Sequence, residues 1–356
     1  MSVPLQHSTP DAVSAQISVR AFATADLQNW NEFVRSHPEG TFFHLAEWQN
    51  VLREAFGHVP HYLLAERDGK IQGVLPLALV SSMLFGRALI STPFCVYGGI
   101  VCSDLQVHRE LTEHACALAR RLKVDYLELR NRRRQHTDWP MKELYVTFRK
   151  AIAADADANM QAIPRKQRAM VRKGIQKGLR SRTDAHTGDH YALYSESLRN
   201  LGTPVFPKKY LDTLQRVFGD ACEILTVLHE EVPVASVLSF YFRDEVLPYY
   251  GGGGAATRSL AANDFMYWEV MERARQRGMR VFDYGRSKRD SGSYDFKVHW
   301  GFEPEPLHYE YYLVRARAMP NLSPTNPSYA RAIRTWQRMP IWLTQWLGPR
   351  IAGYLG

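Results

Sequence analysis

One lysine of the chain stands in a strongly aromatic setting. Lys297 lies among Tyr294, Phe296, Trp300 and Phe302 in the segment SYDFKVHWGF. A fixed cation beside a reacting carbonyl oxygen lowers the barrier to acyl transfer by several kcal/mol, because that oxygen becomes an anion in the tetrahedral intermediate. The aromatic neighbours favour this chemistry for Lys297. The alternative is a surface lysine on a strand, held in water and without a function.

A run of small residues forms a second candidate site. Gly251-Gly252-Gly253-Gly254 is followed by Ala255-Ala256-Thr257-Arg258, and we predict a helix that begins near Asn263. Glycine lets a ligand approach the backbone closely, and a helix N-terminus presents free N–H groups to a phosphate. The pattern therefore predicts a phosphate-binding loop, with a plain strand bulge as the alternative.

Basic residues are concentrated in one segment. Residues 165–182 contain eight Lys or Arg and no acidic residue, within a chain of net charge +9. Arg165, Arg168 and Arg172 are spaced to share one helix face, and with Lys166 they form a candidate site for a phosphate or diphosphate. A solvated helix between domains is the alternative. Arg286, which follows the segment FDYG, is another candidate anion ligand.

Other kinds of catalytic site leave no pattern in the sequence. The thirteen histidines are scattered, the four cysteines form no CxxC pair, and the chain has no HExxH, GxSxG, GxGxxG or Walker motif. We therefore predict no metal site and no general base, and expect buried inert thiols in a reducing compartment. Asp283 is expected to orient its neighbours rather than act as a base.

The order of predicted elements occurs twice, at residues 61–130 and 222–286. Three pairs of positions align the copies: Gly73 with Ala235, Tyr97-Gly98-Gly99 with Tyr250-Gly251-Gly252, and Glu128 with Asp283. Each copy reads as a hairpin, a strand with a glycine step (CVYGGIV in the first), a helix and a closing strand. The repetition indicates an internal duplication.

These observations divide the chain into five parts. We predict a disordered N-terminus (1–16), a first domain (17–150), a basic helical linker (151–182), a second domain (183–318) and an amphipathic helical tail (319–356). The tail combines several Trp, Leu and Ile with Arg331, Arg334, Arg338 and Arg350. That combination suits a helix lying on an anionic membrane surface, with docking onto the second domain as the alternative.

Three passages resemble one known family. TFFHLAEWQNVLREAFGH, AIPRKQRAMVRKGIQKGL and FDYGRSKRDSGSYDFKVHWGFEPEPLHYEYYL are similar to the N-terminal Trp segment, the basic linker and the Phe-Lys region of FemAB-like peptidyltransferases. The resemblance extends over about residues 20–315. The ending NPSYARAIRTWQRMPIWLTQWLGPRIAGYLG resembles the branch associated with exosortase and exopolysaccharide loci. Leu52 stands where some members have a phosphate-binding lysine, which disfavours a nucleotide-linked muropeptide acceptor.

The resemblance implies an α/β fold with two tandem GNAT-like acyltransferase domains. It implies transfer of an acyl or aminoacyl group onto an anionic cell-envelope or exopolysaccharide precursor, with acyl-CoA or aminoacyl-tRNA as donor and no permanently bound cofactor. Lys297 and Phe296 would be catalytic. The donor would lie at residues that surround the glycine loop and the segment FDYG: Tyr250, Gly252, Gly253, Asn263 and Arg286.

Two other functions are weighed against the enzyme. A duplicated fold without an obvious base also suits a non-catalytic protein that binds an anionic glycan or lipid-linked precursor. General RNA binding is weaker, because the basic linker lacks interleaved aromatic residues for stacking, and DNA is not expected as a partner. We see no secretory signal and no apolar stretch of membrane-spanning length, so we expect a cytoplasmic protein, with peripheral contact of residues 331–351 at the inner membrane face.

Overall fold

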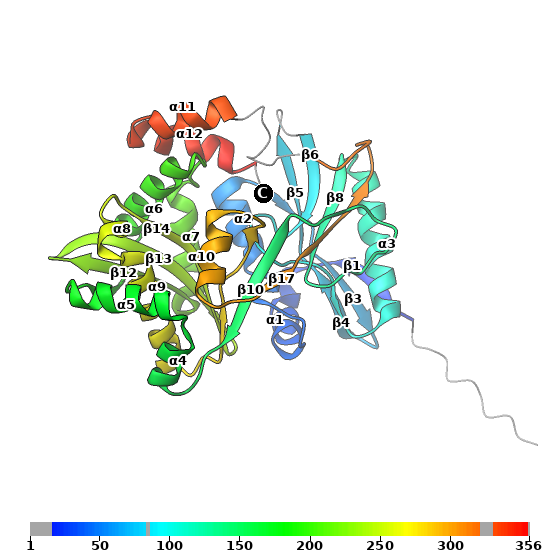
Figure 1. Ribbon diagram of the computed structural model, residues 1–356. Coiled ribbons are helices and arrows are strands. Elements are labelled where there is room, and N and C mark those ends of the chain that lie inside the picture. The colour runs from blue at the N-terminus through cyan, green and yellow to red at the C-terminus, as the bar shows by residue number, and fades with distance from the viewer. Residues whose placement is uncertain (1–15, 83–85, 321–329, 355–356) are drawn as a thin grey trace, which may run out of the picture.

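The computed structural model describes residues 16–82, 86–320 and 330–354, and its strands form three sheets (Figure 1). The expected disordered segment 1–16 lies outside the described residues, apart from its last residue. The first half of the chain builds a four-stranded sheet, in the order β1-β3-β4-β7, and most of a six-stranded sheet, in the order β2-β5-β6-β8-β18-β9. Its elements are β1 (Ser18–Ala21), α1 (Leu27–Ser36), α2 (Trp48–Phe56), β2 (Val59–Pro60), β3 (Leu63–Arg67), β4 (Lys70–Leu75), β5 (Leu77–Ser82), β6 (Gly86–Ser91), β7 (Val101–Cys102), α3 (Leu105–Arg121), β8 (Tyr126–Asn131) and β9 (Met141–Lys142).

The rest of the chain, together with β10 from the end of the first half, forms an eight-stranded sheet, called the second sheet below, in the order β11-β12-β13-β14-β15-β10-β16, with β17 paired to β10. Its elements are β10 (Tyr145–Ala151), α4 (Ala156–Ala162), α5 (Arg165–Gln176), β11 (Arg180–Asp184), α6 (Gly188–Leu201), α7 (Lys208–Phe218), β12 (Cys222–His229), β13 (Val232–Phe242), β14 (Glu245–Gly253), α8 (Thr257–Leu260), α9 (Ala262–Gln276), β15 (Val281–Asp283), β16 (Ser287–Lys288), α10 (Gly292–His299), β17 (Pro304–Pro306) and β18 (His308–Leu313).

Helix α3 shows how local sequence sets an element of the first half. The side chain of Asp104 caps the helix by accepting hydrogen bonds from the backbone N–H groups of Gln106 and Val107. Leu111, Ala115 and Leu118 recur at helical spacing, and all three are buried against the sheet. The helix predicted before the closing strand of the first copy is confirmed.

The two halves exchange their last strands. In each half a strand before a helix runs parallel to the strand after it, as β6 does with β8 and β14 with β15. The next antiparallel neighbour then comes from the other half: β18 pairs with β8, placing Tyr311 opposite Glu128, and β10 pairs with β15, placing Arg149 opposite Asp283. The predicted boundary at residues 150 and 151 therefore falls inside a strand that completes the second sheet.

One local prediction is wrong. The segment CVYGGIV is not a continuous strand, because only Val101–Cys102 pairs with β4; Thr92 and Phe94 take left-handed φ angles, and the backbone N–H groups of Gly98 and Gly99 both bond to the carbonyl of Arg130. The alternative considered for Lys297, a surface lysine on a strand, does not hold, because this residue is buried and lies in α10.

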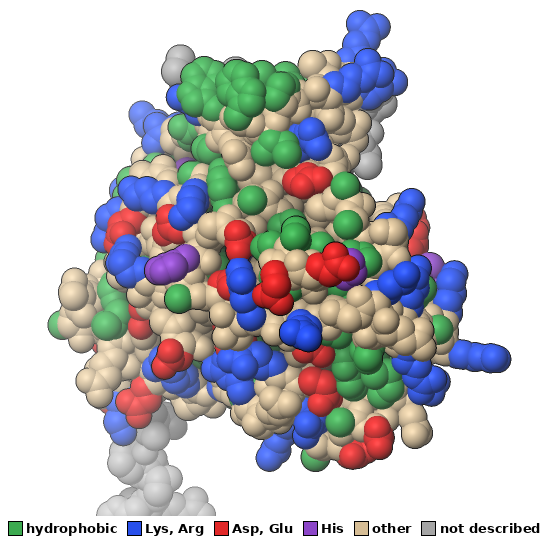
Figure 2. Space-filling view, turned by 90° about the vertical axis from the view of Figure 1, so that its left-hand side faces the viewer, with side chains coloured by type: hydrophobic (Ala, Val, Ile, Leu, Met, Phe, Trp, Pro, Cys, Tyr) green, Lys and Arg blue, Asp and Glu red, His purple; other side chains and the backbone are tan. Residues whose placement is uncertain are grey.

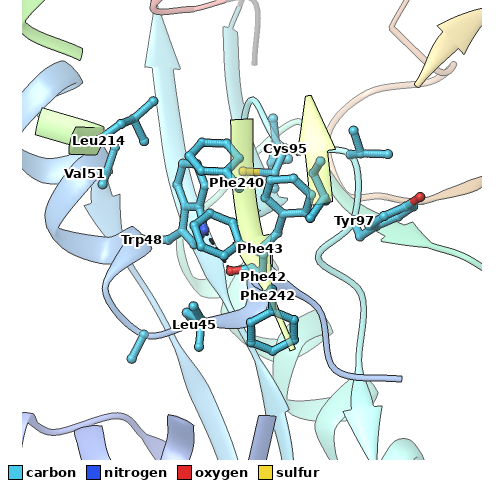
Figure 3. Close-up of a cluster of buried hydrophobic side chains, with 14 of the residues drawn as sticks. Phe42, Phe43, Leu45, Trp48, Val51, Cys95, Tyr97, Leu214, Phe240 and Phe242 are labelled. Atoms are coloured by element: carbon cyan, nitrogen blue, oxygen red, sulfur yellow. Dashed lines mark hydrogen bonds between the residues drawn. The ribbon is translucent and has the colours of Figure 1, made fainter. Parts of the chain in front are cut away.

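An aromatic cluster joins the halves (Figure 3). Phe42 and Trp48 of the first half lie against Phe218 and Phe240 of the second, with ring centroids 4.4 Å apart for Phe42 and Phe240 and 5.1 Å apart for Trp48 and Phe218. The indole N–H of Trp48 donates to the carbonyl of Phe42, so its polar group is satisfied inside the cluster. The halves therefore share one hydrophobic core.

Two C-terminal helices complete the fold. Helices α11 (Ala330–Arg338) and α12 (Ile341–Ala352) lie beside α6. Pro340 stands between them, whereas Pro349 lies inside α12 without ending it. Among the residues that the structure describes, none of the helices is both long and apolar enough to span a bilayer.

The strand exchange predicts that the two halves unfold together. Phe148 is fully buried in β10, which comes from the first half of the chain but belongs to the second sheet. We expect Phe148→Ala to lower the free energy of unfolding by about 3–5 kcal/mol in a single transition. Urea unfolding followed by tryptophan fluorescence and circular dichroism measures this, with exposed Leu201→Ala as the control. Two separate transitions, of which Phe148→Ala moves only one, would contradict the shared architecture.

Candidate functional site

The site begins where β14 and β15 separate. Their parallel ladder joins Glu245 to Val281 and Val246 to Phe282 and then ends. Beyond this point β14 continues toward the glycine run, whereas β15 ends at Asp283. The chain continues after Asp283 as residues 284–286. We call this segment the Lys297 wall, because the amine of Lys297 bonds to its carbonyl groups.

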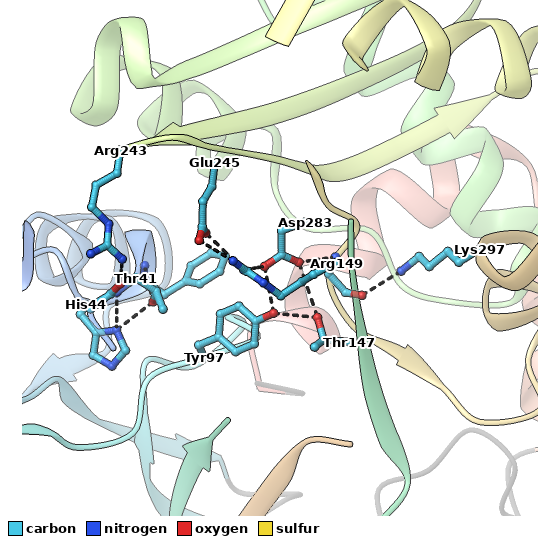
Figure 4. Close-up of polar contacts among 12 residues, drawn as sticks. Thr41, His44, Tyr97, Thr147, Arg149, Arg243, Glu245, Asp283 and Lys297 are labelled. Carbon is cyan, nitrogen blue, oxygen red and sulfur yellow. Dashed lines mark hydrogen bonds and ion pairs between the residues drawn. The ribbon is translucent and has the colours of Figure 1, made fainter. Parts of the chain in front are cut away.

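Asp283 is a buried junction between the halves (Figure 4). One carboxylate oxygen accepts from the guanidinium of Arg149 at 2.6 Å and from the Tyr97 hydroxyl at 2.9 Å, and the other accepts from the backbone N–H of Gly285 at 2.8 Å. Burial, and then the charge of Asp283, raises the pKa of Tyr97 well above its usual value, so this phenol keeps its proton and donates it. With its acceptor sites occupied, Asp283 is suited to positioning its neighbours.

Lys297 reaches the same wall from α10. Its side chain is buried, and its amine donates to the carbonyl oxygens of Gly285 at 3.0 Å and Arg286 at 3.2 Å. The rings of Phe148 and Tyr284 lie 5.3 and 5.4 Å from the amine. Burial is the largest influence on this group and lowers its pKa to about 7, against an opposing effect of Asp283. Lys297 is thus a cation that can lose its proton near neutral pH.

Phe296 and Arg286 flank Lys297 in different ways. The Phe296 ring is half-buried and lies 5.7 Å from Tyr267 and 6.2 Å from Trp300, measured between centroids. The guanidinium of Arg286 donates to the Tyr309 hydroxyl at 3.2 Å and stands 4.6 Å from the centre of the Tyr145 ring. Arg286 therefore shares the wall with Lys297 through its backbone carbonyl, while its charge points toward the first half.

Tyr250 and the glycines after it have packing partners in the protein. The Tyr250 hydroxyl bonds to that of Tyr210 at 2.8 Å within the aromatic core. A Cβ atom on Gly252 would lie 2.6 Å from the Cα of Tyr194 in α6, and one on Gly253 would lie 2.4 Å from the Thr257 hydroxyl oxygen. The absence of a side chain at Gly252 thus lets α6 approach the sheet.

The helix after the glycine run begins close to the predicted position. A short helix, α8, ends at Leu260, Ala261 follows with a left-handed φ angle, and α9 then starts at Ala262. Asn263 is exposed in the first turn of α9. The structure places Asn263 in a helix N-terminal turn, as predicted, and separates it from Gly252 and Gly253 by the turn of α8.

The basic residues of the linker lie along α5. Arg165, Arg168 and Arg172 line one surface hollow together with Ala169 and Gln176. The opposite side of α5 packs on α9, where a Cβ atom on Gly174 would lie 2.8 Å from that of Phe265. Lys166 is exposed and does not line this hollow. The hollow of α5 includes neither Lys297 nor the Lys297 wall. The basic residues and Lys297, both predicted from the sequence, therefore belong to two different candidate sites.

A second hollow borders Tyr97 in the first half. Its polar lining includes His44, Asn131 and Arg132. Burial lowers the pKa of His44 to about 4, so its ring is neutral; Nε2 lies 2.9 Å from the carbonyl oxygen of Gly99 and donates its proton there. The guanidinium of Arg132 lies 5.3 Å from the centre of the Tyr97 ring. This hollow and the Lys297 wall therefore meet at the Tyr97–Asp283 hydrogen bond.

Arg149 and Thr147 were not predicted as site residues. Both lie on β10 and complete the hydrogen-bond network around Asp283. Thr147 shares a 2.6 Å hydrogen bond with the Tyr97 hydroxyl. Neither residue stands in a motif, and only the strand exchange brings them to the second sheet. Within the described ranges no group of His, Cys, Asp and Glu is arranged to hold a metal ion.

The contacts of Gly252 predict a stability effect that is independent of any ligand. Gly252→Ala would force its new Cβ against the backbone of α6, so we expect a loss of about 1–3 kcal/mol in the free energy of unfolding. Gly254→Ala is the matched control, because its Cβ would have a nearest neighbour at 3.4 Å and should change stability by no more than about 0.5 kcal/mol. Equal effects in urea unfolding would show that close packing does not require glycine at position 252.

The lowered pKa of Lys297 predicts a pH-dependent stability. The unfolded chain holds this proton up to a pKa of 10.5, whereas the folded protein releases it near 7. The unfolded state binds more protons between these values, so the contribution of Lys297 to stability improves as pH rises through this window. We expect the wild-type protein to gain stability relative to Lys297→Met from pH 7 upward in urea unfolding. A difference that stays constant, as expected for exposed Lys70→Met, would contradict the lowered pKa.

Comparisons with known proteins identify the fold. Residues 165–298 match the family model described as the acetyltransferase (GNAT) domain, and a comparison with curated proteins gave no match. The crystal structure of FemX is similar with a TM-score of 0.66 and 15% identity, over 84% of this chain and 98% of that one. The C-terminal domain of a putative lysylphosphatidylglycerol synthetase from Agrobacterium fabrum gives 0.54 and 12%, over 80% and 91%. A tandem GNAT protein from the clavulanic acid biosynthesis pathway gives 0.54 and 13%, over 86% and 100%. The chain therefore has the tandem GNAT-like α/β fold, and its second half carries the matched acetyltransferase domain that contains Lys297.

Proposed function

We propose that the protein is an acyltransferase that moves an acyl or aminoacyl group onto a cell-envelope or exopolysaccharide precursor. The observation that carries this proposal is the buried amine of Lys297, held at the end of β15 inside the matched acetyltransferase domain. The donor is acyl-CoA or aminoacyl-tRNA, since GNAT domains use the former and the resemblance to FemAB-like peptidyltransferases implies the latter. The similarity of the C-terminal segment to exosortase-associated proteins supports an exopolysaccharide acceptor.

The reaction uses one cation of this chain, the amine of Lys297. An acceptor amine or hydroxyl attacks the acyl carbon, and the carbonyl oxygen becomes an oxyanion that protonated Lys297 stabilises. When the intermediate collapses, the bond to the thiol or ribose oxygen of the donor breaks, and the proton lost by the acceptor passes to this leaving group. The hydrogen bonds of Asp283 leave it poorly placed to take that proton, so transfer between the substrates supports the proposal best.

One basic region suits an anionic part of a substrate. The hollow of α5 presents three guanidinium groups from Arg165, Arg168 and Arg172, which favours a diphosphate. The hollow beside Tyr97 has a volume of only about 20 Å³, which is room for a water molecule and not for the reacting end of a substrate. We assign a phosphate group of a substrate to the hollow of α5.

Ligand binding distinguishes the donors. Thermal unfolding of the full chain would be compared with acetyl-CoA, free coenzyme A and a non-hydrolysable aminoacyl-tRNA mimic, because a ligand at about 100 times its dissociation constant stabilises the native state by about 2.7 kcal/mol. A shift with both coenzyme A species supports acyl-CoA as donor, and a shift with the mimic alone supports aminoacyl-tRNA. Unchanged unfolding with all three would contradict the transferase and favour a binding protein.

The role of Lys297 predicts a loss of turnover without loss of binding. We expect Lys297→Ala to lower kcat about 100-fold or more in transfer from the bound donor to an envelope-precursor extract, with the thermal shift retained. In the wild-type protein kcat should fall as pH rises above about 7, because the reactive form is the protonated amine.

Lys297→Arg and Lys70→Ala complete this experiment. Arginine stays charged, so any activity that it restores should lack the decline above pH 7. Lys70 is exposed at the start of β4, and its removal should leave both kcat and the pH profile unchanged. A Lys297→Ala protein with normal turnover would exclude this lysine from the reaction.

A further inference from the structure

Helix α12 packs on the protein through its small residues. Thr344, Gly348 and Ala352 recur every fourth position and are the buried residues of this helix. Gly348 lies so close to the chain around Val205 that a Cβ atom on it would stand 2.9 Å from the backbone nitrogen and oxygen of that residue. The inner face of α12 therefore packs closely on the protein and has no room for large side chains.

The large apolar residues of α12 face outward instead. Trp342 is 69% exposed and Trp346 is 57% exposed, although both belong to a folded helix. The guanidinium of Arg350 stands 4.2 Å from the centre of the Trp346 ring and also bonds to the Trp346 carbonyl. Two exposed tryptophans one turn apart, with a cation beside them, form a patch that the rest of the described chain leaves uncovered.

The neighbouring helix supplies more positive charge. Arg331, Arg334 and Arg338 are exposed on α11, whose buried Trp336 faces the protein. From residue 311 to residue 356 the sequence has six arginines and no Asp or Glu. Figure 2 shows a hydrophobic patch at the top of one face, where α11 and α12 lie in Figure 1, with Lys and Arg side chains close to it.

The α11–α12 unit is anchored to both halves of the protein. Beyond its contact with α6, the carbonyl of Gly353 accepts from Nε2 of His58 at 2.8 Å, and a Cβ atom on Gly353 would lie 3.3 Å from the Phe56 ring. Burial lowers the pKa of His58, so this contact does not depend on a charged histidine at neutral pH. The exposed tryptophans are therefore held in place before any partner binds.

We propose that the outer face of α11 and α12 is a docking surface for an anionic lipid bilayer. Tryptophan rings are favourable at the depth of the lipid headgroups, and arginine side chains beside them pair with lipid phosphates. The aromatic residues lie together on one helix and most of the arginines on the next, as in a surface that lies flat on a membrane. The proposal is independent of the acyl-transfer reaction and of Lys297.

Vesicle co-sedimentation of the full chain tests the surface. The probes are vesicles of phosphatidylcholine alone and of phosphatidylcholine mixed with phosphatidylglycerol, at low and at physiological salt. We expect binding to the mixed vesicles that weakens with salt, together with a blue shift of tryptophan fluorescence. No binding to the mixed vesicles at low salt overturns the proposal.

Variants of the patch locate the interaction. Trp342→Ser and Trp346→Ser should each lower vesicle partitioning about tenfold or more, and Arg331→Gln and Arg338→Gln about fivefold each. Exposed Leu105→Ser and Arg109→Gln on α3 are matched controls and should leave partitioning unchanged. Because all the altered side chains are exposed, thermal unfolding should stay as in the wild type.

Two results would assign the patch to another partner. If the chain forms a dimer in sedimentation equilibrium that Trp346→Ser dissociates, and vesicles do not compete with it, the patch is a contact between copies. If Arg331→Gln and Arg109→Gln reduce vesicle binding equally, the net charge of the chain accounts for the binding. Either result overturns the membrane surface and leaves the acyltransferase proposal untouched.

Discussion

The buried ion pair of Asp283 and Arg149 fixes how the two halves meet. The two side chains lie on paired strands, β15 and β10, which come from opposite halves of the chain. Asp283 is fully buried, so its charge needs partners inside the protein. Loss of one partner from a buried pair costs about 3–5 kcal/mol, because the remaining charge is left without compensation. This cost opposes any arrangement in which β10 leaves the second sheet.

The position of Lys297 follows from the same pair. Asp283 accepts from the backbone N–H of Gly285, and the carbonyl of Gly285 in turn accepts from the Lys297 amine. Gly285 has a φ angle of +64°, a left-handed conformation that favours glycine, so the turn depends on this residue as well. The carboxylate that stabilises the domain exchange thereby orients the carbonyl groups that hold the candidate catalytic amine.

Local sequence was enough for the duplication and for several elements, whereas the fold class came from the resemblance to FemAB-like proteins. The order of elements predicted two related halves, and the start of α9 beside Asn263 was close to its observed place. The comparisons add support in the match of residues 165–298 to the acetyltransferase domain. These predictions succeeded because they depend on hydrophobic period and on signals within a few residues of each element.

The partners of the exchanged strands could not be predicted in this way. The residues of β10 have the sequence pattern of a buried strand. This pattern is the same whether the strand pairs with the first half or with the second, so it does not predict the partner strand. Arg149 and Thr147 therefore escaped notice. The packing role of Gly252 could not be predicted either. A glycine that allows a helix to pack closely and a glycine that allows a phosphate to approach the backbone look the same in the sequence.

The C-terminal helices show why two alternatives from sequence need not exclude each other. An amphipathic pattern predicts that the apolar side of a helix is buried, and this gave a choice between membrane and second domain. In α12 the face of Thr344, Gly348 and Ala352 is buried, because small side chains allow the closest approach to α6 and Val205. The tryptophans are consequently left on the outside. Docking onto the protein is thus what presents the aromatic face to solvent, and the same contact that anchors the helix creates the surface available to a partner.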